Sequence, residues 1–167
     1  MALFALDQNF PDPIIEALND FIPEAELVPL REIDPALTEI DDWQVLLALY
    51  HDPRPWDGLV TNDRHMLNLP REMAVLRQTN LTLVVAHDSG HDPVRATGLL
   101  FTHLGYICRQ TTDANSQVWE LTANNRPAKD AWHHLERIAS HRSTNAEALW
   151  REWRLSNAEL REDPLAL

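Results

Sequence analysis

The stretch Asp57-Gly58-Leu59-Val60-Thr61-Asn62-Asp63 decides the fold, because a short apolar run ends in a carboxylate where a buried strand would stop. The same pattern opens the chain, where Leu3-Phe4-Ala5-Leu6 runs straight into Asp7. Between the two, Asp41-Asp42 stands at the head of an apolar helical pattern. In an α/β sheet, residues just past the carboxyl ends of neighbouring strands share one crevice. We therefore expect these acids to converge in a divalent-metal site.

Outward from these strands, short apolar runs alternate with helical segments, which is typical of a mostly parallel sheet covered by helices. The pattern predicts strands at residues 2–6, 25–29, 58–61, 81–86 and 118–122, with 106–110 as a short strand or an extended connector. It predicts helices at residues 12–21, 38–50, 70–78, 92–104, 127–139 and 144–161. We expect one α/β domain over residues 1–140. The remaining residues, 141–167, would be a C-terminal helix that packs on the domain or serves a partner.

The composition is that of a folded soluble protein. The 167 residues are 44% apolar and 24% charged, which is enough for one proper core. No apolar run approaches the ~20 residues that a membrane-spanning helix needs, and no basic leader precedes the first apolar run, so we expect neither a membrane anchor nor a signal peptide. The single cysteine, Cys108, excludes an internal disulfide and fits the reducing cytoplasm.

The charge balance opposes polyanion binding over most of the surface. The net charge is −12, whereas nucleic-acid-binding proteins normally present a basic face. Lys129 is the only lysine among 14 cations, and arginine suits bidentate phosphate contacts. An arginine-rich composition is also common in GC-rich genomes. An acidic protein can still act on nucleic acid if metal ions neutralise its site.

Separated carboxylates suit a magnesium or manganese site. Both ions prefer carboxylate oxygens and keep several waters, so few protein ligands are needed. Two such ions about 4 Å apart activate a water and stabilise the leaving oxygen in phosphodiester hydrolysis. Each acid also has a simpler interpretation, since an Asp after a strand or before a helix is often a turn former or an N-cap.

Three ordered blocks resemble the PIN-like family. Residues 6–11, Leu-Asp-Gln-Asn-Phe-Pro, look like its opening strand and turn. Residues 41–48 are similar to its second block, an Asp at a helix start with a small residue, here Ala48, seven positions later. Residues 59–66 resemble its third block, an apolar pair followed by Thr-x-Asp. Together with the strand at 81–86, the match covers residues 3 to about 86.

The resemblance implies a PIN-like three-layer sandwich and a metal-dependent ribonuclease, as in many toxins of toxin–antitoxin pairs. Carried over by position, the catalytic metal-binding acids would be Asp7, Asp41 and Asp63. The spacing to Ala48 favours Asp41, and a one-residue shift of the helix would favour Asp42. The supporting residues would be Asn9, Thr61 and Asn62, and the phosphate-binding residues Arg64 and His65.

Several alternatives stay open at this stage. Family nucleases often carry a fourth acid, for which Glu32, Asp34 and Glu39 all fall in the expected interval. The chain would bind RNA as substrate, with a cognate antitoxin, another protein or a second copy as further partners. A catalytically inactive PIN-like interaction module is the alternative. A receiver-like domain fits poorly, because Lys129 lies in a predicted helix rather than after a late strand.

Overall fold

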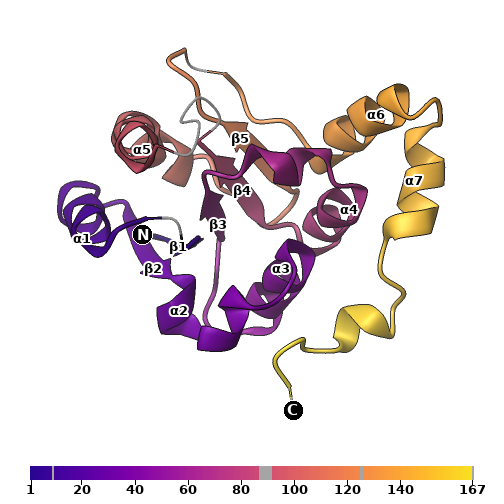
Figure 1. Ribbon diagram of the computed structural model, residues 1–167, viewed down its shortest axis with the longest axis horizontal. Helices are drawn as coiled ribbons and strands as arrows, with labels where there is room; N and C mark the ends of the chain where they lie inside the picture. The colour runs from indigo at the N-terminus through magenta and orange to yellow at the C-terminus, as the bar shows by residue number, and fades with distance from the viewer. Residues whose placement is uncertain (9, 87–91, 125, 167) are drawn as a thin grey trace.

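A computed structural model describes residues 1–8, 10–86, 92–124 and 126–166. Within these residues, five strands form one all-parallel sheet in the order β2-β1-β3-β4-β5 (Figure 1). The strands are β1 (Ala2–Leu6), β2 (Ala25–Pro29), β3 (Gly58–Thr61), β4 (Thr82–Val85) and β5 (Gln117–Glu120). The predicted α/β fold with a central parallel sheet is confirmed.

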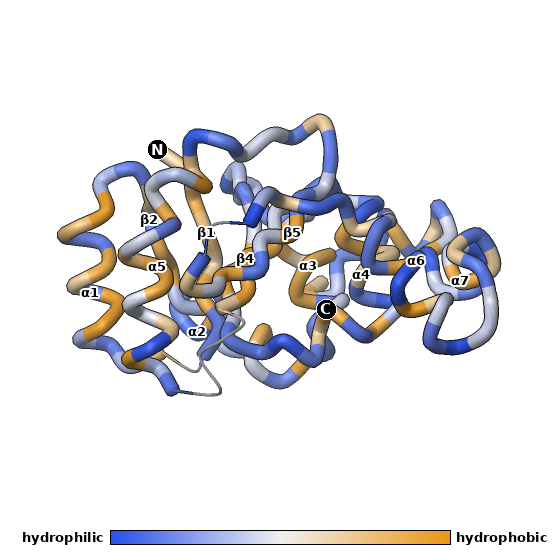
Figure 2. Tube along the Cα trace, turned by 90° about the horizontal axis from the view of Figure 1, so that it is seen from above, coloured by the Kyte–Doolittle hydropathy of each residue, from blue (hydrophilic) through white to orange (hydrophobic). Residues whose placement is uncertain are grey.

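Helices cover both faces of the sheet, which gives three layers. One face carries α1 (Asp12–Phe21) and α5 (Pro93–Cys108), and the other carries α3 (Asp42–His51), α4 (Pro70–Thr79) and α6 (Ala131–His141) (Figure 2). Alternate strand residues face opposite layers. Phe4 and Val60 join the core under α1 and α5, whereas Ala5 and Leu59 join the core under α3 and α4. In the described part of the chain, no helix is both long enough and apolar enough to cross a membrane.

The start of α3 differs from the prediction. The helix predicted for residues 38–50 begins only at Asp42, because Pro35–Thr38 form the 3₁₀ helix η1, whose first turn is capped by Asp34 through the amide of Ala36 at 2.8 Å. Asp41 is itself the N-cap of α3, and Gln44 closes its capping box by accepting from the Asp41 amide at 3.1 Å. Asp42 therefore lies in the first turn of the helix.

The extended alternative for residues 106–110 is wrong, because α5 continues to Cys108. Its buried residues Leu100, Leu104 and Ile107 keep helical spacing to the end of the helix. Asp92 caps the start of α5 by accepting from the amide of Val94 at 3.0 Å.

Helix α6 begins four residues later than predicted. The preceding segment pairs with the sheet instead, since Lys129 and Val118 exchange backbone hydrogen bonds of 2.7 and 3.0 Å. Asp130 then caps the helix through the amide of Trp132. Residues 126–129 form a strap over the outer edge of β5, which protects the edge strand.

The C-terminal helix α7 (Ala146–Trp153) is shorter than predicted and packs against α4 and α6. The guanidinium of Arg77 lies over the rings of Trp132 and Trp150, at 4.3 and 5.1 Å from their centroids. Beyond the helix, Gln78 exchanges two hydrogen bonds with the backbone of Leu155. The chain then makes only a short 3₁₀ turn at Glu159–Arg161, because these contacts fix residues 154–160 along α4 and α3.

Candidate functional site

The strand order reverses between β1 and β3, and this reversal places a crevice at their carboxyl ends. The register pairs Leu6 with Val60. The amide of Asp7 donates to the carbonyl of Val60 at 3.0 Å, so Asp7 continues the ladder one residue beyond β1. Doubly wound sheets bind their ligands at such switch points.

One buried hydroxyl connects the two strand ends. Thr61, which is 2% exposed, donates from Oγ1 to Oδ2 of Asp7 at 2.9 Å and accepts from the amide of Asp63 at 3.0 Å. Oδ1 of Asp7 accepts from the amide of Gln8 at 2.7 Å. Oδ1 of Asp63 accepts from the amide of His65 at 2.8 Å and so caps the 3₁₀ helix η2 (Arg64–Asn68). Both carboxylates are therefore held in place by hydrogen bonds.

Asp41 and Asp42 differ in burial and in what they contact. Asp41 is exposed and occupied with capping α3, whereas Asp42 is half-buried. Burial raises the pKa of Asp42, and the negative charges of Asp7, Asp63 and Asp41 raise it further, with His65 acting in the opposite direction. Of the two residues that the sequence left open, burial and electrostatics favour Asp42.

Glu72 is a fourth acid that the sequence interpretation missed. It lies in the first turn of α4 and is only 7% exposed. Burial raises its pKa, and the charges of Asp42 and Asp41 raise it further. A Glu after a helix-starting proline is normally an exposed residue that favours the helix dipole. The only signal in the sequence is the apolar run that follows, Met73 to Leu76, which indicates that most of the helix surface is buried.

Asn62, Arg64 and His65, which were also predicted to serve the site, flank Asp63 in the sequence. Asn62 is 5% exposed and lies between Thr61 and Asp63, while Arg64 and His65 are exposed on η2. Asn9 lies outside the described residues. Glu32, Asp34 and Glu39 were the candidates for a fourth acidic ligand. Glu32 lies on α2 (Leu30–Ile33), Asp34 caps the start of η1, and Glu39 caps its end.

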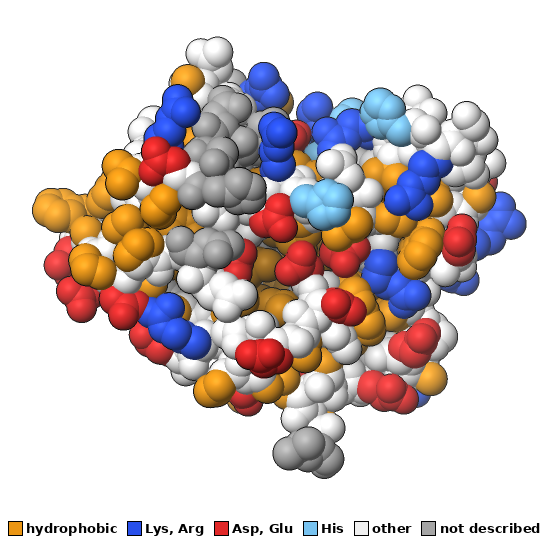
Figure 3. All heavy atoms as spheres, in the orientation of Figure 1, with side chains coloured by type: hydrophobic (Ala, Val, Ile, Leu, Met, Phe, Trp, Pro, Cys, Tyr) orange, Lys and Arg blue, Asp and Glu red, His pale blue; other side chains and the backbone are white. Residues whose placement is uncertain are grey.

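The donor chemistry fits a hard divalent cation. Several Asp and Glu side chains gather around a hollow near the centre of Figure 3, over the ends of the strands, and Lys, Arg and His side chains gather above them. The raised pKa of Asp42 reflects burial and the repulsion of neighbouring acids, and a bound cation relieves that repulsion. Among the described residues, no three His, Cys, Asp or Glu side chains are arranged closely enough to ligate one ion directly. Mg²⁺ commonly keeps several of its waters, so the carboxylates need not all touch it.

Searches against protein-family models, curated proteins and solved structures find no match to this chain. The geometry at the switch point, together with the sequence blocks, is therefore the basis on which a function is assigned.

Proposed function

We propose that this chain is a PIN-like, Mg²⁺- or Mn²⁺-dependent nuclease that hydrolyses RNA phosphodiesters. The observation that carries the proposal is the Thr61 hydroxyl that joins Asp7 and Asp63 at the β1/β3 switch point, with Asp42 near enough for the charges of both acids to raise its pKa. Glu72 adds a fourth carboxylate, whose pKa is raised in part by the charge of Asp42. Four acids without an equal number of cations at the ends of parallel strands are typical of a metal site rather than of a structural ion-pair network.

The roles of the residues follow from their contacts. Asp7, Asp42, Asp63 and Glu72 would hold the cation, which when bound supplies Lewis acidity and an activated water. Thr61 fixes the Oδ2 of Asp7, and the amide of His65 fixes the Oδ1 of Asp63. The pKa of the Asp42 carboxyl is raised by burial and by the neighbouring acids, and a bound cation, which favours the ionised form, would lower it.

The RNA strand would be oriented by the exposed side chains of η2. Arg64 and His65 directly follow Asp63, so a phosphate held by the guanidinium of Arg64 would lie beside the acids. Water adds to phosphorus and the ester oxygen leaves as a hydroxyl group. Because the chain is acidic overall, neutralisation of the acids is a condition for the approach of the phosphate.

Cleavage of a labelled single-stranded RNA with and without Mn²⁺ tests this function. Wild type should cleave with Mn²⁺ and stop on addition of EDTA. Asp7→Asn and Asp63→Asn should lose activity while the circular dichroism of the folded state is kept. Glu16→Gln on α1, an exposed acid away from the switch point, is the matched control and should cleave normally. Equal cleavage by all four proteins would reject the assignment.

The second candidate is a PIN-like interaction module without catalysis. The exposed aromatic pair Phe21 and Phe101, whose ring centroids are 6.2 Å apart, favours it, because the rings are 76% and 41% exposed on α1 and α5. Calorimetry without any heat of Mn²⁺ binding, combined with recovery of one specific protein partner, would support this alternative. A partner encoded beside the chain would further suit a toxin and its antitoxin, and a homodimer is the other arrangement that the exposed rings would serve.

A further inference from the structure

The charge of this protein is divided between two parts of the fold. Residues 1–53 contain 12 Asp and Glu and only one cation, Arg31, whereas the other 114 residues contain 14 acids and 13 cations. The acidic part comprises β1, α1, β2, α2 and α3, the indigo and purple segments at the left and bottom of Figure 1. A polyanion is repelled by that part, so the approach of an RNA strand is opposed less over the rest of the fold, which includes β4, α5, β5 and α6.

A groove lies in this second part, between α5 and the strap over the edge of β5. Its volume is about 430 Å³, and its walls are Tyr106 and Gln110 from α5, Gln117 and Trp119 from β5, and Arg126 and Pro127 from the strap. Ligand pockets for small organic groups begin at about 300 Å³. The groove is therefore large enough for one nucleoside unit.

The aromatic wall of the groove is fixed before any ligand binds. Gln117 donates from Nε2 to the carbonyl of Gln110 at 2.8 Å, and its Oε1 accepts from Nε1 of Trp119 at 3.1 Å. Trp119 meets Tyr106 edge to face, with ring centroids 6.0 Å apart and an interplanar angle of 89°. Trp119 is 7% exposed and Tyr106 is 48% exposed. The indole of Trp119, held by its hydrogen bond to Gln117, therefore packs against the solvent-exposed ring of Tyr106.

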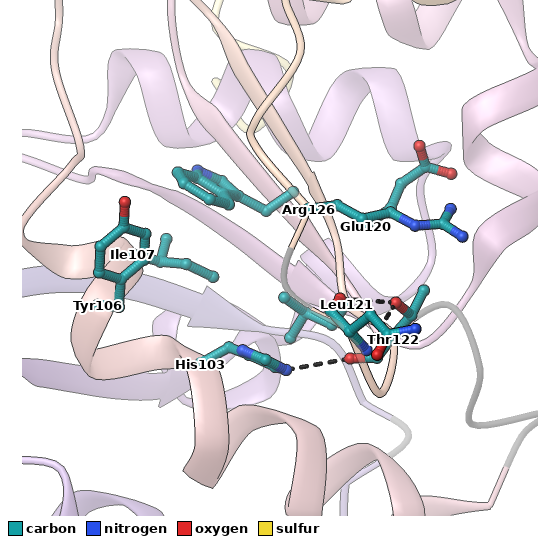
Figure 4. Close-up of a pocket in the computed structure, with 9 residues that line it drawn as sticks. His103, Tyr106, Ile107, Glu120, Leu121, Thr122 and Arg126 are labelled. Carbon is teal, nitrogen blue, oxygen red and sulfur yellow. Dashed lines mark hydrogen bonds between the residues drawn. The ribbon is translucent and has the colours of Figure 1, made fainter.

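A smaller pocket, which shares three lining residues with the first and forms the smaller part of the groove, reaches the end of β5. His103, 8% exposed on α5, donates from Nε2 to the carbonyl of Thr122 at 3.0 Å, since a carbonyl only accepts. Figure 4 shows this contact, with Tyr106 on the same helix and Arg126 across the end of β5. Tyr106, Trp119 and Arg126 line both parts of the groove.

The chemistry of the groove matches a nucleotide. None of the residues that line the larger part is an acid, although the chain has 26 of them, and Arg126 supplies a cation. Bases of single-stranded RNA stack on aromatic rings, while arginine pairs with the adjoining phosphate. Glu120, in the smaller part, is faced by Arg137 at 4.0 Å.

The β5 wall of the groove extends from the start of the strand toward its carboxyl end. Gln117 is in register with Thr82 and Gly58, whereas Trp119 is in register with Val84 and Val60, one residue before Thr61. Adjacent strands are about 4.8 Å apart, so the ends of β3 and β5 are separated by roughly 10 Å. A phosphodiester held at Asp63 and a base held at Tyr106, which contacts Trp119, would belong to different nucleotides of one strand.

We propose that the groove between α5 and residues 126–129 is a base-binding subsite for single-stranded RNA, with the base stacked on Tyr106 and its phosphate on Arg126. The subsite rests on the proposed nuclease function for its role, but its binding can be measured without metal or cleavage.

The test is the affinity of a fluorescently labelled 12-nucleotide single-stranded RNA for the full chain in EDTA, followed by anisotropy at several salt concentrations. Loss of one stacked base corresponds to about 1–3 kcal/mol, so Tyr106→Ala should weaken binding roughly 5- to 100-fold and Tyr106→Phe should keep wild-type affinity. Arg126→Gln should lower the slope of log K against log salt by about 0.7, the value for one single-strand phosphate.

Two matched variants serve as controls. Tyr50 on α3 is 49% exposed, almost the same as Tyr106, and Arg142 is an exposed cation at the end of α6. Tyr50→Ala and Arg142→Gln should bind as wild type does. If Tyr106→Ala matches Tyr50→Ala, or if wild type does not bind the RNA, the subsite is refuted. If the Tyr106 and Arg126 effects are present but no protein cleaves RNA with Mn²⁺, the subsite stands and the nuclease function fails.

Discussion

Thr61 Oγ1 donates to Oδ2 of Asp7 at 2.9 Å and thereby connects the ends of β3 and β1. The two residues are 54 positions apart in sequence, so this bond exists only once the strands are paired. The bond leaves Asp7 in one orientation beside the crevice, which is the condition for a carboxylate to serve as a ligand without rearrangement.

Replacement of Thr61 by Val should therefore weaken the site more than the fold. We expect a loss of about 1 kcal/mol in the free energy of unfolding and a roughly 10- to 100-fold weaker affinity for Mn²⁺. Urea denaturation and calorimetric titration measure the two effects. Thr61→Ser keeps the hydroxyl and should restore affinity, and a Val variant that binds Mn²⁺ as tightly as wild type would remove the positioning role.

Asp42→Asn should make the protein more stable at neutral pH while abolishing metal binding. The pKa of Asp42 is raised in the folded state, so its contribution to stability is present at low pH and is lost as the pH rises through the folded-state pKa. Above that pH, the neutral amide avoids the repulsion from Asp7 and Asp63. The melting temperature of the variant should exceed that of wild type at pH 7 and approach it near pH 4.

The same experiment with Mn²⁺ should reverse the order of stability. A ligand that binds only the folded state raises the melting temperature of wild type, and the variant that cannot bind it gains nothing. Identical shifts in the two proteins would place the cation elsewhere.

Asp41 and Asp42 should differ sharply despite being adjacent. Asp41→Ala removes the N-cap of α3 and should cost about 1 kcal/mol of stability with little change in Mn²⁺ affinity. Asp42→Ala should have the opposite profile, with lost binding and retained stability. Thermal unfolding and metal titration of the two variants decide which Asp faces the crevice, and the reverse result would reinstate Asp41.

His134 should make the fold sensitive to acid. It is fully buried in α6, and burial, with Arg137 nearby, lowers its pKa from 6.5 to about 4. Neither ring nitrogen has a hydrogen-bond partner among the described residues. Below pH 6.5 the imidazole of His134 binds a proton in the unfolded chain but stays neutral in the folded chain. The free energy of unfolding should therefore fall by up to about 3 kcal/mol between pH 6.5 and pH 4.

Urea denaturation at a series of pH values measures this effect. His134→Leu, which preserves the apolar packing, should flatten the profile over that interval. An unchanged slope in the variant would assign the acid sensitivity to the carboxylates instead.

Arg77 should hold α7 to the domain through its stacking on Trp132 and Trp150. Arg77→Met keeps much of the apolar stem but loses both cation–π contacts, each worth about 0.5–2 kcal/mol. We expect lower stability and faster proteolysis after α6, followed by mass spectrometry. Arg77→Lys should rescue only in part, because an ammonium cannot stack on two rings as a planar guanidinium does.

Much of the architecture was predictable because the strand signals are local. The apolar runs at residues 2–6 and 58–61 end in acids, and both are strands of the central sheet. The boundaries that were wrong depend on long-range contacts. Residues 127–130 have a helix-starting proline, but Lys129 pairs with Val118 of β5 instead. The helix expected to reach Arg161 ends at Trp153. Just beyond it, the backbone amide of Leu155 donates a hydrogen bond to the side chain of Gln78.

The site was predictable only as far as the strand ends define it. Asp7 and Asp63 follow strands directly, so their proximity follows from topology. Whether Asp41 or Asp42 belongs to the site depends on where α3 begins. A shift of the helix start by one residue would reverse that choice. Glu72 comes from a helix that packs beside α3, and the apolar run from Met73 to Leu76 is the only local feature that separates it from an ordinary first-turn Glu.

The uneven placement of acids gives the molecule a permanent electric dipole, with its negative pole over α1 and α2. On a positively charged chromatography resin or sensor chip, the molecules should adsorb in one orientation, with α1 and α2 against the charged surface. Retention would then follow the local density of acids on the adsorbed face rather than the net charge of the whole chain.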